Sequence, residues 1–236
     1  MKRVKSREFN RLIFAFSIRY KRRELTIVEL TSLFIKRFRG WRLFRMKHKG
    51  TCPLETKRLY LRRFVVSDAK MVFENWSSDE EVTKFVAWAP HQNVQVTERV
   101  LKSWEQSYQL LDTYQWAIVD RESLEVIGSI SLFQFHRRGR KVYCELGYCL
   151  AKDYWNKGLA TEAARRVLAF AFLEVGVDVV TAKHDVLNKA SGRVMQKLGM
   201  TQDKLVRRAV LTERRGWVDC DTYILLKEDF IDENLH

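Results

Sequence analysis

The sequence lacks the cysteine and histidine patterns of metal sites and redox centres. Its four cysteines, Cys52, Cys144, Cys149 and Cys220, include no Cys-x-x-Cys pair, and no histidine stands at metal-ligand spacing. Cys144 and Cys149 lie five residues apart on an expected strand, so they face opposite sides of the sheet. We therefore expect no bound metal and a reduced, cytoplasmic protein with buried free thiols.

Long hydrophobic runs are also missing. The apolar segments at residues 12–16 and 33–35 are too short to span a bilayer. The first has basic residues on both sides and no small-residue cleavage site, which argues against a signal peptide. No internal repeat or low-complexity tract is present. With 46% hydrophobic and 12% aromatic residues, the 236-residue chain can form one ordinary domain with a buried core plus an extension.

The positive charge is concentrated at the N-terminus. Residues 1–50 carry 16 Lys and Arg against 3 Glu, a net charge of +13, whereas the rest carries 27 against 26, a net charge of +1. We expect a basic extension over residues 1–50 and a folded domain over residues 51–236. Three hypotheses stay open for residues 1–45: a membrane-bound amphipathic helix, an arm that docks on RNA, or translated upstream sequence with Met46 as the native start. Contact with nucleic acid or membrane is expected only through this segment.

Hydrophobic periodicity predicts a sheet with covering helices. Alternating apolar residues predict strands over residues 59–65, 115–119, 126–135, 143–150, 179–186, 205–211 and 222–226. Caps and helical periodicity predict helices over residues 67–76, 79–85, 94–111, 159–175 and 188–198. Glycines at 139 and 216 supply turns between strands, because glycine permits positive φ.

Two consecutive strand-turn-helix units are the most informative part of the chain. Strand 143–150 leads into the turn at residues 154–158 and then a helix. Strand 179–186 leads into residues 188–191 and a second helix that ends in Lys-Leu-Gly-Met at residue 200. Ligands of open α/β sheets bind where strands hand over to helices, and the N–H groups of a helix N-terminus suit a phosphate.

These patterns resemble the acetyl-CoA-binding core of the GNAT N-acetyltransferase superfamily, in its RimJ/RimL-like branch. The resemblance rests on Tyr-Trp-x-x-Gly-x-Ala-Thr-Glu-Ala at 154–163, Asn-x-x-Ser at 188–191 and the first-strand sequence at 55–62. It implies an α/β (α+β) fold: a mixed, mostly antiparallel central sheet flanked by helices, with strands four and five splayed. It also implies acetyl transfer from acetyl-CoA to a primary amine, with the N-terminal α-amine of a protein, such as a ribosomal protein, as the leading acceptor.

The turn at Gly158 fits the phosphates of acetyl-CoA. Gly158 has no Cβ, so a pyrophosphate can approach the N–H groups around Lys157 to Thr161, and Lys157 adds positive charge. Trp155 departs from the wider superfamily, which has Gln or Arg there, and cannot hydrogen-bond a phosphate as Arg would. The alternative is an ordinary tight turn that caps a core helix. The expected acetyl-CoA-binding residues are Cys149, Leu150, Trp155, Asn156, Lys157, Gly158, Leu159, Ala160, Thr161, Asn188, Lys189 and Arg193.

The resemblance implies further contacts for the rest of acetyl-CoA. Main-chain groups of Cys149 and Leu150 would pair with the pantetheine amides where the strand splays near Leu150, and an N–H there could hold the thioester oxygen. Asn188 would bond to the pantetheine, although cap-like spacing offers a structural alternative. Lys189 and Arg193 are candidate partners of the 3′-phosphate, with a solvated helix face as the alternative.

Two residues are the catalytic candidates. Glu145 lies on a strand between apolar neighbours, where partial burial raises the pKa of a carboxylate and suits a general base. The alternative is a solvent-facing residue paired with a cross-strand Arg or Lys. The resemblance implies that Ser191 protonates the thiolate of coenzyme A. Glu162 is a weaker base candidate, because the helix dipole alone favours an acid in a first turn.

The acceptor is less well defined by the sequence. The resemblance implies that the early helices close over it, and Trp217, Asp219 and Tyr223 are weaker candidates for contacting it. A strongly acidic acceptor channel would favour a polyamine or an aminoglycoside, and acids cluster at 79–81, but surface acids are common and the cluster does not decide between the acceptors. A non-enzymatic acetyl-CoA-binding module is the third hypothesis. We interpret His91, His136 and His184 as structural, because they show no partner spacing.

Overall fold

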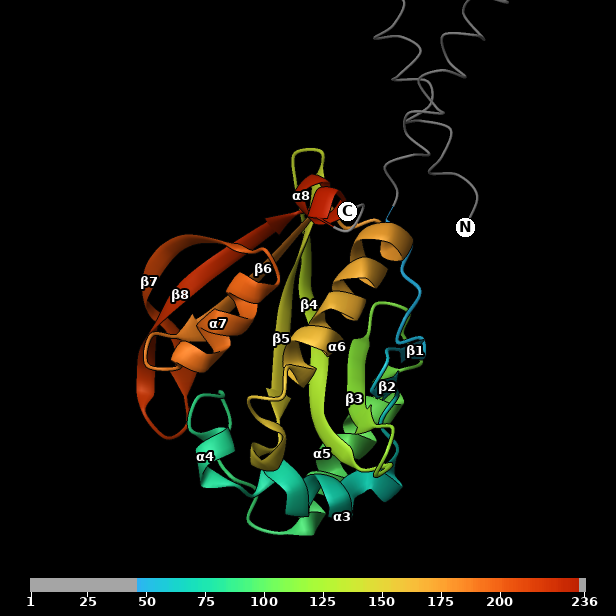
Figure 1. Cartoon of the computed structure of the whole chain (residues 1–236). Coiled ribbons are helices and arrows are strands. Elements are labelled where there is room, and N and C mark those ends of the chain that lie inside the picture. The colour runs from blue at the N-terminus through green and yellow to red at the C-terminus, as the bar shows by residue number, and fades with distance from the viewer. Residues whose placement is uncertain (1–45, 234–236) are drawn as a thin grey trace, which may run out of the picture. The chain divides into compact units, whose positions relative to one another are not determined.

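The structure is a computed structural model that describes residues 46–233 (Figure 1). The chain divides between Arg45 and Met46, and the unit that begins at Met46 holds the sheet and its helices. Lys47 already belongs to this unit, since its N–H donates to the carbonyl of Val175 at 3.0 Å. The hypotheses on residues 1–45 lie outside the described residues, and the boundary at residue 50 stays a prediction.

The described residues form one mixed sheet in the order β1-β2-β3-β4-β5-β6-β8-β7. β5 and β6 are parallel, and the other neighbours are antiparallel. The predicted fold class is thus confirmed. The strands are β1 (Leu54–Glu55), β2 (Leu59–Arg62), β3 (Tyr114–Asp120), β4 (Val126–Arg138), β5 (Lys141–Leu150), β6 (Val179–Asp185), β7 (Thr201–Thr212) and β8 (Gly216–Leu226).

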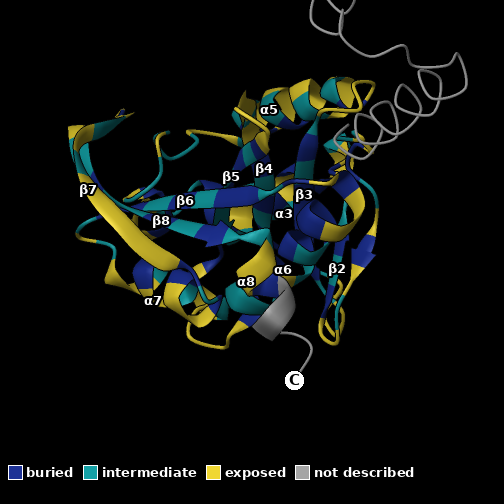
Figure 2. Ribbon diagram, turned by 90° about the horizontal axis from the view of Figure 1, so that it is seen from above, coloured by how far each residue is buried: buried dark blue, intermediate teal, exposed yellow. Residues whose placement is uncertain are grey.

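Helices cover both faces of the sheet (Figure 2). α3 and α5 pack on one face, whereas α6 and α7 pack on the other. α5 ends at residue 107 rather than 111, and the Thr113 hydroxyl caps its last carbonyl at 2.8 Å. The helical elements are η1 (Val66–Asp68), α3 (Ala69–Val72), η2 (Phe73–Ser77), α4 (Glu80–Thr83), α5 (Val94–Ser107), η3 (Lys152–Tyr154), α6 (Leu159–Ala169), η4 (Phe170–Val175), α7 (Lys189–Lys197) and α8 (Lys227–Glu233). β1 and α8 were not predicted.

The main core lies between α6 and the sheet. Ala163, Ala164, Val167 and Leu168 of α6 are completely buried. The two alanines let the helix axis approach the strands, and each larger apolar side chain contributes about 1.5–3 kcal/mol by its burial. The start of α6 is thereby held in a fixed place at the end of β5.

β5 and β6 diverge along their length. Their pairing stops at Leu146 and Ala182. β5 continues to Leu150 beside β4, and β6 continues to Asp185 beside β8. The expected splay of these strands is confirmed, and it begins before Leu150, directly after Leu146. We call the space between the C-terminal parts of the two strands the gap.

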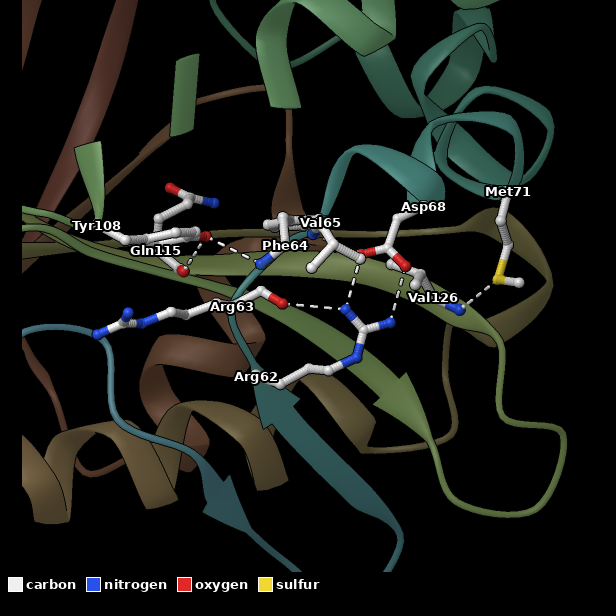
Figure 3. Close-up of polar contacts among 9 residues, drawn as sticks. All are labelled: Arg62, Arg63, Phe64, Val65, Asp68, Met71, Tyr108, Gln115 and Val126. Carbon is white, nitrogen blue, oxygen red and sulfur yellow. Dashed lines mark hydrogen bonds and ion pairs between the residues drawn. The ribbon is translucent and has the colours of Figure 1, made fainter. Parts of the chain in front are cut away.

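Polar contacts fasten the segment after β2 to the sheet and to α5 (Figure 3). Arg62 and Asp68 form a two-pronged ion pair at 2.7 and 2.8 Å. The hydroxyl of Tyr108, at the end of α5, accepts from the N–H of Phe64 at 3.0 Å and donates to the carbonyl of Gln115 at 2.8 Å. This hydroxyl thus links the segment after β2 to β3.

Replacing Tyr108 with phenylalanine is expected to lower the free energy of unfolding by about 1–3 kcal/mol, because it leaves a buried N–H and a carbonyl without their partner. Burial raises the pKa of Tyr108 to about 12, so the hydroxyl stays protonated. Urea denaturation measures the effect. Tyr143→Phe is the matched control, since the Tyr143 hydroxyl makes no hydrogen bond to another described residue. Equal losses in the two variants would contradict the bridging role.

Candidate functional site

The open edge of β5 presents main-chain groups to the gap. Main-chain groups of a strand alternate between its two neighbours. The carbonyl of Val142 accepts from the N–H of Asp178, just before β6, at 2.9 Å, and the N–H of Ala151 donates to the carbonyl of Ile127 in β4 at 2.7 Å. By this alternation Tyr148 and Leu150 face the gap, whereas Cys149 faces β4. For main-chain contact within the gap, the geometry therefore favours Tyr148 over the expected Cys149.

The turn before α6 leaves helix N–H groups free. Asn156 and Gly158 have φ of 60° and 77°, and Gly158 is the N-cap without a side-chain cap. The N–H groups of residues 159–161 therefore lack intrahelical partners. A Cβ at residue 158 would meet only Nη2 of Arg58, at 3.7 Å. This uncrowded set of donors at a helix N-terminus fits a phosphate group.

Trp155 and Lys157 occupy the outside of this turn. The indole N–H of Trp155 donates to the carbonyl of Leu150 at 2.8 Å, so it fastens the turn to the end of β5. That donor is not free for a phosphate, in keeping with the departure from the superfamily pattern. The ammonium of Lys157 lies 5.1 Å from the ring centre of Tyr154 and is exposed to solvent.

Glu162 has a structural role at the same turn. Its carboxylate accepts from the Thr56 hydroxyl at 2.6 Å and from Nε and the main-chain N–H of Arg58 at 2.7 and 2.9 Å. Arg58 also donates to the carbonyl of Lys157 at 3.0 Å. Partial burial acts to raise the pKa of Glu162, but these hydrogen bonds together outweigh it and the pKa is lowered. An ionised, fully engaged carboxylate of this kind is unsuited to act as a general base.

A hydrogen bond links β5 to α7, the helix that follows β6. Asn188 caps α7, and its Oδ1 accepts from the N–H of Ser191 at 3.2 Å. The hydroxyl oxygens of Ser191 and Tyr148 are 2.9 Å apart, and the Tyr148 hydroxyl also donates to the Ser191 carbonyl at 3.2 Å. Sequence reasoning missed Tyr148. The alternation of side chains along β5 places Tyr148 on the same face as Cys144 and Leu146, the face that α7 covers, and just beyond the point where β5 leaves β6. This alternation could have identified it.

Tyr148 remains a proton donor throughout the physiological pH range. Burial raises the pKa of Tyr148 to about 12, and the hydrogen bond with Ser191 only partly opposes that effect. Asn188 and Ser191 are therefore part of a helix cap, as the structural alternative supposed, and also part of a hydroxyl pair at the gap.

Glu145 lies on the opposite face of the sheet, the face covered by α3 and α5. Its carboxylate forms an ion pair with Lys183 of β6 at 3.0 Å, and both side chains are largely buried. This is the cross-strand pairing considered for Glu145. Further along β6, Asp185 forms a buried ion pair with Arg215 of the β7–β8 turn. Acidic and basic groups thus line β6 on this face, which we call the acceptor face.

α4 closes one side of the acceptor face. Glu81 pairs with Lys152, just after β5, at 2.5 Å, and Glu80 pairs with Arg214 of the β7–β8 turn at 3.1 Å. α4 thus bridges the segment after β5 and the turn between β7 and β8, and it lies between them in Figure 1. Arg215 lies 5.4 Å from the ring centre of Phe85, in the segment that follows α4. We call residues 79–89 the strap.

The remaining candidates are scattered. Lys189 and Arg193 are exposed on α7, and neither forms an ion pair with another described residue. Trp217 is exposed beside Arg208, and Asp219 accepts from the main-chain N–H of Arg208 at 2.8 Å. Tyr223 is buried in the main core, on the face away from Glu145.

The three histidines that we interpret as structural each make a local hydrogen bond. His91 bonds to the hydroxyl of Thr97 at 2.8 Å, His136 to the carbonyl of Gln134 at 2.8 Å, and His184 to the carbonyl of Asp185 at 2.7 Å. Burial lowers the pKa of His91, although the charge of Glu213 partly opposes it.

Residues 46–233 contain no group of three or more His, Cys, Asp or Glu side chains placed to hold a metal ion. Across the same residues, none of the helices combines the length and the apolar character that a bilayer crossing requires. The prediction that no metal is used stays a prediction.

Known proteins share this arrangement. Residues 58–201 match the family described as the acetyltransferase (GNAT) domain. The uncharacterized N-acetyltransferase YoaA of Bacillus subtilis (strain 168) is 28% identical over 177 residues, which cover 74% of this chain and 96% of YoaA. YdaF of the same organism, whose name gives it provisionally as a ribosomal N-acetyltransferase, is 28% identical over 133 residues, 56% of this chain and 70% of YdaF.

The fold has solved counterparts. The crystal structure of a GNAT-family acetyltransferase from Bacillus anthracis superposes with a TM-score of 0.63 at 24% identity, covering 75% of this chain and 99% of that protein. The splayed strands and the uncapped start of α6 lie within the matched family region. The chain belongs to the GNAT family and is an acetyl-CoA-dependent N-acetyltransferase.

Proposed function

We propose that the protein transfers acetyl to the N-terminal α-amine of a protein, in the manner of the RimJ/RimL-like branch. The observation that carries this proposal is the strap, because it narrows the approach to the acceptor face. Glu81 joins α4 to Lys152 after β5, and Glu80 joins it to Arg214 of the β7–β8 turn. Glu213 of the β7–β8 turn adds hydrogen bonds to Ala87 and Ala89 of the strap, at 3.0 and 3.3 Å. A chain end or a small amine passes such an opening more easily than a folded surface.

The acidic run at residues 79–81 gives no support to a polycationic acceptor. Asp79 caps α4 by accepting from the N–H groups of Glu81 and Val82. Glu80 and Glu81 are both held by basic side chains. The acids at 79–81 therefore do not distinguish a polyamine or an aminoglycoside from a peptide acceptor. The name of YdaF supports a ribosomal protein as the acceptor.

Each part of the site has a task in the proposed reaction. Bound acetyl-CoA supplies an activated acetyl carbonyl. The free N–H groups of residues 159–161 and Lys157 would hold its phosphates. A main-chain N–H of Tyr148 or Leu150, at the open edge of β5, would stabilise the oxyanion as the amine nitrogen bonds to the carbonyl carbon.

The attacking amine must then lose a proton, and the departing sulfur must be stabilised. Glu145 is our candidate to accept the proton that the amine loses, directly or through water, with Lys183 holding its carboxylate in place. One hydroxyl of the Tyr148–Ser191 pair would turn away from its present acceptor and donate a hydrogen bond to the sulfur as the carbon–sulfur bond breaks. Four free thiols, of which Cys144 and Cys220 are buried, support the proposal that this occurs in the cytoplasm.

Acetyl transfer by the full chain from radiolabelled acetyl-CoA tests the proposal. The acceptors are a ribosomal-protein extract, peptides with a free N-terminus, the same peptides with a blocked N-terminus and an internal lysine, polyamines and aminoglycosides. We expect label on free α-amines and none on the blocked peptides. Label confined to a small amine or to lysine would overturn the proposed acceptor, and acetyl-CoA binding without any transfer would favour a binding module.

A further inference from the structure

A cavity of about 560 Å³ opens beside the acceptor face, and the site described above does not use it. It arises because β4 extends beyond the end of β3. Tyr114, the first residue of β3, pairs with Leu132, and the residues of β4 after Leu132 pair with β5 alone among the described strands. A bulge between Phe133 and His136 then bends β4, and Gln134 takes a φ of +54°. Bulges of this kind re-aim side chains near functional sites.

The cavity lies one strand away from the start of the gap. Two of its lining residues are in register with β5: Ser131 is opposite Gly147, and Phe133 is opposite Glu145. A Cβ at Gly147 would lie 2.9 Å from Cε1 of Phe133 and 3.6 Å from the hydroxyl of Ser131. The phenyl ring therefore lies across Gly147, on the border between the cavity and the edge where β5 leaves β6. Neighbouring strands are about 5 Å apart, so a group attached to a reacting amine can reach the cavity.

The walls combine rings with solvent-accessible polar groups that have no partner among the described residues. Trp104 and Phe133 offer aromatic surface. The carboxylate of Asp112 and the side-chain amide of Gln115 make no hydrogen bond to another described residue, and the same holds for the hydroxyl of Ser131. Among the described residues of the lining, Asp112 is the only acid, and His48 is present but no Lys or Arg. Such a surface suits a long side chain with an aliphatic stem and a cationic end.

We propose that this cavity binds an acceptor side chain near the reactive amine and selects a basic one, lysine or arginine, at the first positions of the peptide. The proposal rests on the proposed function, since it names the acceptor class of the same site. The strap leaves this side of the acceptor face open: α4 bridges Lys152 and the β7–β8 turn, whereas the cavity lies beside β3 and α5. The basic side chain places its stem along the rings and its charge toward Asp112.

The first experiment compares two peptides that differ only at residue two, lysine or its uncharged analogue norleucine. We expect the wild-type protein to favour lysine in kcat/KM, and Asp112→Asn to lower that preference about fivefold through the KM of the peptide. Glu122→Gln is the matched control, because Glu122 is an exposed acid in the turn between β3 and β4 and lies outside the cavity. An unchanged preference in Asp112→Asn would overturn the selection of charge.

The second experiment fills the cavity with Ser131→Phe. We expect the KM of the lysine peptide to rise at least tenfold, while a Gly-Ala peptide and acetyl-CoA keep their KM values within about twofold. Equal losses for both peptides would overturn the subsite. Thermal unfolding checks that the variant is folded, and Phe133→Leu, which keeps the cavity open, replaces it if it is not. For that variant we expect a weaker aromatic contact and a KM rise confined to the lysine peptide.

Binding without turnover separates this proposal from the proposed function. Peptides whose α-amine is already acetylated cannot react, and calorimetry measures their affinity for the wild-type and variant chains. If no peptide is acetylated but the lysine product binds the wild-type chain and not Ser131→Phe, the subsite stands and the proposed acceptor fails. If free peptides are acetylated and the two products bind all variants equally, the acceptor class stands and the subsite is overturned.

Discussion

Replacing Tyr148 with phenylalanine and Ser191 with alanine together is expected to lower kcat about a hundredfold, the usual range for losing a positioned proton donor. The two hydroxyl oxygens lie 2.9 Å apart across the gap. Charge on the departing sulfur develops only during the reaction, so the loss belongs to turnover rather than to binding. The KM for acetyl-CoA should change by less than about threefold, because the cap of α7 by Asn188 and the start of α6 stay intact. Steady-state kinetics with each single variant and the pair measure the effect.

The single variants divide the roles of the two hydroxyls. If Ser191→Ala alone causes most of the loss, Ser191 faces the sulfur and Tyr148 positions it. Since the pKa of Tyr148 is about 12, its donor is present below that pH, and kcat should not fall with its ionisation between pH 7 and 10. Tyr143→Phe, on the same strand and the opposite face, serves as the control. Turnover equal to that of the parent in the double variant would remove both hydroxyls from the mechanism.

Replacing Gly158 with valine is expected to weaken acetyl-CoA binding about thirtyfold or more. A β-branched residue at φ of 77° is strained, and its side chain stands where a phosphate would approach the N–H groups of residues 159–161. Isothermal titration with acetyl-CoA gives the Kd directly.

Gly176→Val provides a control with matched backbone strain. Gly176 has φ of 85° at the far end of the same helical segment, and a Cβ there would meet no atom within 4 Å. Both variants should lose about 1–2 kcal/mol of stability, the cost of a left-handed residue. Only Gly158→Val should lose affinity. Equal Kd values for the two variants would refute a phosphate site at the start of α6.

The elements around the proposed cofactor turn could be predicted from sequence because they are local. A strand, a glycine turn and an amphipathic helix follow one another within residues 143–175, and the two periods of 2.0 and 3.6 residues identify them. The left-handed φ of Gly158 follows from the same few residues. The spacing of Asn188 and Ser191 likewise indicates an N-cap within the first turn of α7.

The acceptor side could not be predicted, because its contacts join distant segments. Nothing in the run of acids at 79–81 shows that Glu80 pairs with Arg214 and Glu81 with Lys152. The partner of Glu145 depends on the register of β5 against β6, and a shift by one residue would place Lys183 on the other face. The contact between the hydroxyls of Tyr148 and Ser191 depends on how α7 packs against β5, which the local sequence does not show.

The hydrogen bonds of Glu162 join the turn before α6, where we propose that phosphate binds, to the segment between β1 and β2. The carboxylate at the start of α6 is held by Thr56 and Arg58, about a hundred residues earlier in the chain, and Arg58 also grips the carbonyl of Lys157. A change in residues 56–58 is therefore expected to alter the conformation of the turn before α6. A truncation that starts at β2, directly after Arg58, would keep the motifs at residues 154–163 and 188–191 and would still loosen the turn before α6, because Arg58 and Thr56 would be lost.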